Sequence, residues 1–94
     1  MSKSILSIDK ECYFCHRTEP LHRHHIFPGR NRQKSEENGF WVWLCWMHHT
    51  GDHGVHTDTA LDRALRAECQ RKFEETHSRE EFLEIIGINY IEED

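Results

Sequence analysis

The sequence lacks any long hydrophobic run, and none approaches the ~20 apolar residues that a membrane-spanning helix needs. Its first residues, Met1 to Lys10, also lack the basic start and the apolar stretch of a secretory signal peptide. These two absences predict a cytoplasmic protein. Thiols stay reduced in that compartment, so neighbouring cysteines favour metal binding over a disulfide.

Apolar material is scarce as well. The 94 residues are 36% apolar and 31% charged, which favours one small globular domain, residues 1–94, with a modest core. Domains of this size often depend on a further stabilising element. The four Cys and nine His make a bound metal the expected one.

An excess of basic residues is also missing. The net charge is −5, which argues against nonspecific binding to nucleic acid. The charge is uneven, however: residues 1–50 carry seven Lys and Arg against five Asp and Glu, and residues 51–94 carry five against twelve. A polyanion is therefore expected to contact the first half of the chain.

Two extended segments are predicted in that first half. Leu21 to Phe27 ends at the turn sequence Pro28-Gly29, and Phe40 to Cys45 is rich in aromatic and β-branched residues. The polar segment between them, Arg30 to Gly39, has no apolar repeat and is predicted to be a loop. These segments predict a β-hairpin, which follows a loosely held lead-in over residues 1–11.

The second half begins with a predicted helix. An apolar residue recurs at every fourth position: Leu61, Leu65, Cys69 and Phe73. Thr59 with Asp62 resembles a capping box at the start of this helix. Because Cys69 lies on the apolar stripe, it is predicted to be a core residue.

A second helix is predicted near the C-terminus. Ser78 with Glu81 forms another capping-box pattern, and Gly87 is the expected end of the helix. In the tail that follows, Ile88 and Tyr90 are expected to dock on the core, while the terminal acidic residues stay in water.

Two short metal-binding motifs lie about thirty residues apart. They are Cys12-Tyr13-Phe14-Cys15 and Cys45-Trp46-Met47-His48. A gap of two residues lets each pair occupy adjacent corners of one tetrahedral Zn²⁺, so Cys12, Cys15, Cys45 and His48 are predicted to bind a structural zinc. Since four protein ligands leave no position open to a substrate, catalysis would use other residues.

Six histidines remain around these motifs: His22, His24, His25, His49, His53 and His56. Adjacent residues of a strand point to opposite faces, so His24 and His25 are expected to differ in role. His22 shares a face with His24.

The stretches "LHRHHIFPG" and "WLCWMHHTGDHGVH" resemble the HNH, or His-Me finger, endonucleases. In that family a β-hairpin and a helix enclose one divalent metal, often beside a zinc knuckle. The likeness extends furthest in small phage proteins related to a recombination-enhancement nuclease that depends on RecA, over roughly Glu11 to Tyr90. It implies a DNA endonuclease of α+β class, with a zinc-stapled ββα-metal core at residues 11–57 and a C-terminal helical part at residues 58–90.

The same resemblance implies a role for each histidine. His24 and His49 would bind a catalytic ion, Mg²⁺, Mn²⁺ or Zn²⁺, and His25 would be the general base that takes a proton from water. For the third ligand, the spacing of the colicin DNases points to His53. The "GVH" of the phage proteins points to His56, which is preferred. Cleavage would leave a 5′-phosphate.

One residue of the family pattern is missing. HNH enzymes usually carry an Asn in the loop that orients the base, and no Asn stands shortly before Leu44 and Cys45. Ser35 and Asn38 are the nearest candidates for a hydrogen bond to the backbone of His25.

Basic residues around the predicted site are expected to contact DNA phosphates. They are Arg23, Arg30, Arg32 and Lys34. Because they are few, we expect a protein partner to assist binding, such as a recombinase filament or another phage or host DNA-processing protein. The alternative is a zinc-bound DNA- or protein-binding module without catalysis, which would bind one zinc and no second ion.

Overall fold

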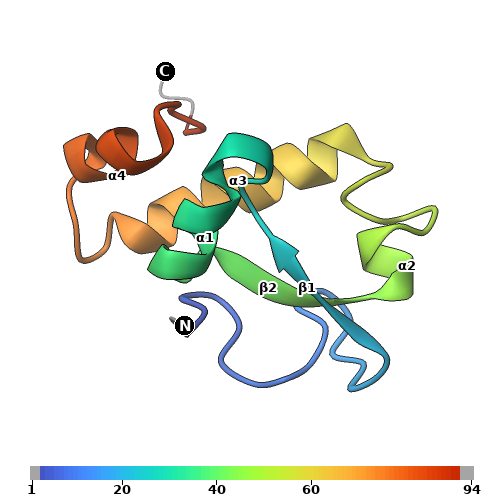
Figure 1. The fold of residues 1–94 in the computed structure, drawn as a ribbon. Helices are drawn as coiled ribbons and strands as arrows, with labels where there is room; N and C mark the ends of the chain where they lie inside the picture. Colours follow the sequence, from blue (N-terminus) through green and yellow to red (C-terminus); the bar gives the residue numbers. More distant parts are fainter. Residues whose placement is uncertain (1–2, 92–94) are drawn as a thin grey trace.

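The structure, a computed structural model of the chain, describes residues 3–91 and has an α+β architecture (Figure 1). A two-stranded antiparallel sheet is combined with helices. The elements in chain order are β1 (Leu21–His25), η1 (Gly29–Asn31), α1 (Arg32–Asn38), β2 (Trp41–Cys45), α2 (Trp46–His49), α3 (Thr59–Phe73) and α4 (Arg79–Ile86). Among residues 3–91 no helix is long and apolar enough to cross a membrane.

The predicted hairpin is confirmed. Leu21 pairs with Cys45 at one end of the ladder, and His25 pairs with Trp41 at the other. The strands are each a little shorter than the sequence suggested, because Phe27 and Phe40 lie beyond the last ladder pair. The hairpin therefore places His24 and His25, at the end of β1, beside the start of β2.

The two faces of the hairpin have different surroundings. Val42 and Leu44 point to one face, where they are fully buried in a common core with Leu65 of α3. Trp41 and Trp43 point to the other face, which the N-terminal segment borders. His24 pairs with Val42 and His25 with Trp41, so the two histidines point to different faces of the hairpin, as predicted.

Aromatic side chains form the centre of the core, where α3 and α4 meet the end of the hairpin. Ring centroids of neighbouring phenylalanines in this cluster are 5.4 to 5.9 Å apart, mostly in edge-to-face contact. The cluster consists of Phe27, Phe40, Phe73 and Phe82. Cys69 is fully buried in the same core, which confirms its predicted structural role.

The predicted loop at residues 30–39 is wrong, because most of it forms α1 (Figure 1). The helix buries a single residue, Ser35, whose hydroxyl donates to the Phe27 carbonyl at 2.9 Å and accepts from the Phe27 amide at 3.2 Å. Gly39 ends it with a positive φ of 75°, which a residue with a side chain rarely adopts. A helix anchored by one buried serine has no apolar repeat, so periodicity could not reveal it.

The two C-terminal helices are confirmed, with one correction at a helix start. The cap of α3 is Asp58, which accepts a hydrogen bond from the Leu61 amide at 3.0 Å, so the capping box expected at Thr59 is wrong. Asp58 lies one residue before Thr59, and its side-chain oxygen takes the place of the Thr59 hydroxyl as the capping acceptor. The capping box of Ser78 with Glu81 at α4 is present as predicted.

The N-terminal segment is held against the hairpin, which corrects the expectation of a loose lead-in. The Ile5 amide donates to the Gly39 carbonyl at 3.0 Å, and the Ser4 hydroxyl donates to the Trp41 carbonyl. The Ser7 hydroxyl accepts from the Trp43 amide at 3.2 Å. These bonds satisfy backbone groups on the outer edge of β2, so the segment acts as part of the fold.

The C-terminal tail docks through one of the two residues expected. Tyr90 packs on Phe27 with ring centroids 5.5 Å apart, as predicted, and its amide donates to the buried Gln70 side chain at 2.7 Å. Ile88 is 54% exposed, so its predicted docking is wrong. The acidic residues 92–94 lie outside the described part of the chain.

Candidate metal centres

The four residues of the predicted zinc site come together in space. The Sγ atoms of Cys15 and Cys45 are 3.6 Å apart, and His48 Nδ1 lies 3.3 Å from Cys45 Sγ and 3.6 Å from Cys12 Sγ. Bonds of ~2.0 to 2.3 Å to a tetrahedral zinc place neighbouring ligand atoms roughly 3.5 to 3.8 Å apart. Cys12, Cys15, Cys45 and His48 are therefore close enough to hold a metal ion, and the set fits a structural zinc.

Local backbone structure brings the two motifs together. The Tyr13 amide donates to the Trp43 carbonyl at 2.8 Å, which ties the first motif to β2. The turn closes through Cys12, whose amide donates to the Arg17 carbonyl and whose carbonyl accepts from the His16 amide, both at 2.8 Å. Cys45 is the last residue of β2, and α2 starts directly after it. One turn and one strand end thus bring the four potential ligands together.

The electrostatics of Cys12 suit a metal-bound thiolate. Burial opposes ionisation of its thiol, but the backbone amides of Cys45, Cys15 and Phe14 outweigh burial and hold the pKa of Cys12 below its ordinary value. A thiolate is the form that binds zinc.

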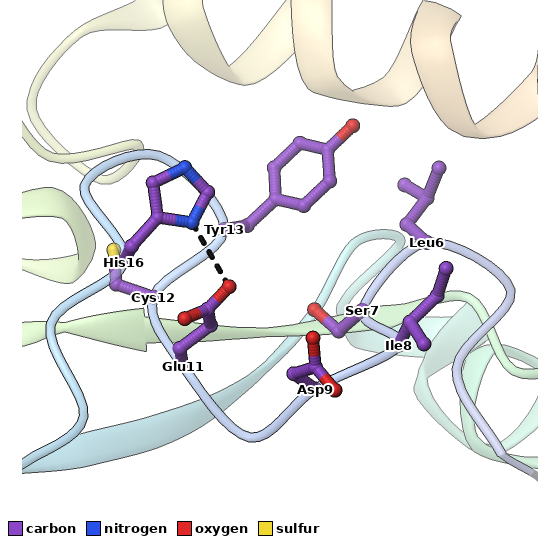
Figure 2. Close-up of a pocket in the computed structure, with 8 residues that line it drawn as sticks. All are labelled: Leu6, Ser7, Ile8, Asp9, Glu11, Cys12, Tyr13 and His16. Carbon is purple, nitrogen blue, oxygen red and sulfur yellow. Dashed lines mark hydrogen bonds and ion pairs between the residues drawn. The ribbon is translucent and has the colours of Figure 1, made fainter.

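A small cavity of about 220 Å³ lies between the N-terminal segment and this turn. Figure 2 shows its lining, with Glu11 Oε1 bonded to His16 Nδ1 at 3.0 Å and Asp9 on the opposite side. Among residues 3–91, none of these three residues belongs to a group of three potential metal ligands within binding distance. In residues 3–91 such grouping occurs twice, at the zinc motif and at a set of three histidines.

The second group consists of His24, His49 and His56, each of which offers one ring nitrogen within 4.8 Å of the others. His49 Nε2 is 3.1 Å from His56 Nε2. The ring of His24 lies 5.3 Å, between centroids, from each of the other two. His53 is exposed and is not a member of this group.

The loop after α2 explains why His56 reaches the group. The Val55 amide donates to the His48 carbonyl at 2.9 Å and the His56 amide to the His49 carbonyl at 3.1 Å, so the chain folds back along α2. The buried Val55 side chain anchors this return. Gly54 allows it, because a Cβ there would come within 2.7 Å of the His49 backbone.

His24 is the buried member of the group. Its side chain is 4% exposed, and its Nε2 has no hydrogen-bond partner among residues 3–91. Burial, and then the nearby His49 and His56, lower the pKa of His24 to about 3. Burial, then His56 and His22, lower the pKa of His49 to about 4. Both rings are therefore neutral near pH 7, and the unpartnered nitrogen of His24 can offer a lone pair to a metal ion.

His25 lies on the other face of β1 and has a carboxylate partner. Its Nε2 is 2.7 Å from Glu36 Oε2, and Glu36 Oε1 accepts from Arg23 at 2.7 Å. The hydrogen bond from His25 and the charge of Arg23 lower the pKa of Glu36 despite partial desolvation. A charged carboxylate accepts a hydrogen bond, so in the neutral ring of His25 Nε2–H donates to Glu36 and Nδ1 carries the lone pair.

His25 and the three-histidine group share one cavity. It measures about 220 Å³ and is lined by Arg23, His24, His25, Pro28, Arg32, His49 and His56. Residues from both faces of β1 line this cavity, because the strand ends at His25. Two arginines, a carboxylate-paired histidine and three convergent imidazoles therefore border the same small space.

The other residues singled out in the sequence lie as follows. Ser35 bonds Phe27 and Asn38 bonds the Lys34 carbonyl, so neither bonds His25, and the proposed substitutes for the missing Asn are wrong. Arg30 and Lys34 are exposed outside the cavity. The exposed His22 contacts His49, with their Nδ1 atoms 3.1 Å apart.

Glu36 is the site residue that the sequence did not reveal, because its segment had been taken for a loop. Its position four residues after Arg32 is the only available signal: a helix there places both side chains on one side. No protein-family profile matches the chain, and neither a characterised protein nor a solved structure matches it. The functional argument therefore rests on these residues and their geometry.

Proposed function

We propose that the protein is a metal-dependent DNA endonuclease with a ββα-metal, HNH-type site. The observation that carries the proposal is the shared cavity, where His25 with its Glu36 partner borders the group of His24, His49 and His56. A separate cysteine-rich set beside it accounts for a structural zinc. A scaffold protein needs the cysteine-rich set and has no use for the histidine group.

In this proposal His24, His49 and His56 hold a divalent cation. Three imidazole donors suit Zn²⁺ better than Mg²⁺ or Mn²⁺, which prefer oxygen ligands. When bound, the cation would stabilise the negative charge that develops on the phosphate and on the departing 3′ oxygen. The unpartnered Nε2 of buried His24 supports this assignment, because a ligand there would remove an unsatisfied polar atom.

His25 acts as the general base. Glu36 accepts its Nε2–H and fixes the ring, so Nδ1 is the nitrogen that removes a proton from the attacking water. The water oxygen bonds to phosphorus, the bond from phosphorus to the 3′ oxygen breaks, and the leaving oxygen takes a proton from solvent. The products are a 5′-phosphate and a 3′-hydroxyl. Glu36 thus supplies the orientation that an Asn usually supplies in this family.

Arg32 is the cavity residue best suited to contact the substrate phosphate. It lines the cavity, it is exposed, and within residues 3–91 it makes no ion pair. With a net charge of −5, the protein would bind duplex DNA weakly by itself. Recruitment by a protein partner such as a recombinase filament is part of the proposal for that reason.

The competing function is a zinc-bound binding module that does not catalyse. It is favoured by the exposed Trp46 and Met47 of α2, at 56% and 39%, which offer apolar area to a partner beside the zinc set. The two functions differ in metal content, because a module would hold one zinc and a nuclease would also bind an ion at the histidines.

The test is nicking of supercoiled plasmid by zinc-loaded protein in molar excess over DNA, with Mn²⁺, Mg²⁺ or additional Zn²⁺. Excess protein compensates for weak binding. We expect metal-dependent nicks with 5′-phosphate ends, which a ligase can reseal. Absence of nicking with every ion, together with one zinc per chain, would favour the binding module.

A further inference from the structure

The outer face of the hairpin carries a groove that the proposed reaction does not use. Its volume is about 530 Å³, and Trp43 and Trp41 form its floor. The N-terminal segment forms one wall, with Lys3, Ser7 and Lys10. Trp43 is half-buried and Trp41 is 6% exposed, so the accessible aromatic surface in this groove belongs to Trp43.

Cationic side chains lie over these rings. The Lys10 ammonium is 5.0 Å from the centroid of Trp43, and the Arg23 guanidinium is 4.0 Å from that of Trp41 and 5.3 Å from that of Trp43. Among residues 3–91 neither Lys3 nor Lys10 forms an ion pair, whereas Arg23 is paired with Glu36. The lysines are therefore available to an incoming anion.

The groove and the proposed catalytic cavity share one lining residue, Arg23. Arg23 lines the groove, a neighbouring depression that it shares with His25 and Arg32, and the cavity beside His24. The charged residues along this path are Lys3, Lys10, Arg23 and Arg32 against Asp9 and Glu36. The path carries a charge of +2 (four minus two), although the whole chain carries −5.

We propose that this groove binds an unpaired strand of nucleic acid next to the cleaved phosphate. A partly exposed indole beside the Lys10 ammonium, in a groove that Lys3 also lines, matches the base and phosphate of a single strand, whose bases are free to stack. A duplex keeps its bases stacked inside and would offer the groove only its phosphates. A base on Trp43 would replace Lys10 above the ring, and the ammonium would then reach an adjacent phosphate. This inference rests on the proposed function, since the strand would lead into the nuclease cavity.

The experiment compares fluorescence anisotropy of a labelled single-stranded oligonucleotide with that of its duplex. The full chain is used zinc-loaded, without any added divalent ion. We expect the single strand to bind several-fold more tightly. Lys10→Ser should weaken strand binding about tenfold, with a shallower dependence on salt, and Trp43→Leu should weaken it about tenfold or more. Trp43→Phe keeps an aromatic ring and should bind nearly as the native protein does.

Lys72→Ser is the matched control, since Lys72 is an exposed lysine of α3, away from the groove, and should leave binding unchanged. Lys10 is exposed, so its variant is decisive even if Trp43→Leu fails to fold. The proposal is overturned if the duplex binds as tightly as the single strand, if neither binds, or if Lys10→Ser behaves as Lys72→Ser does.

Plasmid nicking by the same preparations separates this proposal from the nuclease assignment. Nicking without any effect of the groove variants on strand binding would overturn the groove alone. Strand binding that depends on Lys10, without nicking in any metal, would overturn the nuclease and leave a strand-binding module.

Discussion

His48 and His49 are adjacent in α2, yet their imidazoles belong to different metal-ligand groups. His48 Nδ1 lies 3.3 Å from Cys45 Sγ, and His49 Nε2 lies 3.1 Å from His56 Nε2. One short helix therefore connects the two groups. An ion that fixes His48 also restricts the direction of His49, so under the proposed function the structural zinc helps to place the catalytic ion.

Loss of a zinc ligand should consequently affect both groups. We expect Cys45→Ala to lose zinc, to unfold at much lower temperature and to lose binding of the second ion, because structural zinc in small domains contributes on the order of 10 kcal/mol. Elemental analysis and thermal unfolding measure these effects. Cys69→Ala removes a buried cysteine outside the set and should keep zinc, at a cost of about 1 kcal/mol in the free energy of unfolding. Equal zinc content in the two variants would contradict the assignment.

The third ligand of the histidine group can be tested with a matched pair. His56→Ala should weaken binding of Mn²⁺ or Co²⁺ at this group at least tenfold, because one of three convergent nitrogens is removed. His53→Ala should bind as the native protein does, since His53 lies on the exposed loop outside the group. Calorimetric titration of zinc-loaded protein gives both affinities. The reverse order would show that His53 is the ligand.

Glu36 should matter for turnover more than for metal binding. Glu36→Gln can turn its amide toward His25 and favour the wrong tautomer, so we expect nicking to slow about 10- to 100-fold with zinc content unchanged. Glu37→Gln changes the next residue of the same helix, an exposed side chain bonded to Gln33, and serves as the control. Similar rates for the two variants would remove Glu36 from the mechanism.

The buried thiol of Cys69 should not respond to pH as an exposed thiol does. Burial, and then the nearby charge of Glu68, raise the pKa of Cys69 far above its ordinary value. The thiolate is the reactive form, so alkylation by iodoacetamide in the folded, zinc-loaded protein should stay slow as the pH rises from 7 to about 9. Mass spectrometry locates the label, and denaturant should restore rapid labelling. A rate that rises about tenfold per pH unit in the folded state would contradict this burial.

Elements with periodic apolar residues or fixed turn chemistry could be predicted from the sequence. The stripe that includes Leu65 and Phe73 gave α3, and the capping box of Ser78 with Glu81 gave the start of α4. In α1 the anchoring contact is polar and involves one residue, Ser35, whose bonds to Phe27 depend on the fold and leave no local pattern. Polar long-range contacts such as these, and those of Glu36 with Arg23 and His25, are not visible to periodicity.

The candidate metal groups also differ in how far a local sequence pattern predicts them. Spacing alone predicted the cysteine-rich set, because CxxC and CxxH constrain pairs of ligands locally. The choice of His56 over His53 came from a resemblance, and its geometric basis is the return of the chain at Gly54, where a close backbone approach excludes a side chain. Glu36 needed the fold, because its distance from His25 depends on a helix that the sequence did not predict.

The most direct test of the central claim is the nicking rate of His25→Ala compared with that of the native protein at saturating metal. Removal of the general base should slow nicking about 100-fold or more while zinc content and thermal unfolding stay close to native. His77 is an exposed histidine that belongs to neither candidate metal group, and His77→Ala should nick at the native rate. Equal rates for His25→Ala and the native protein would contradict the account.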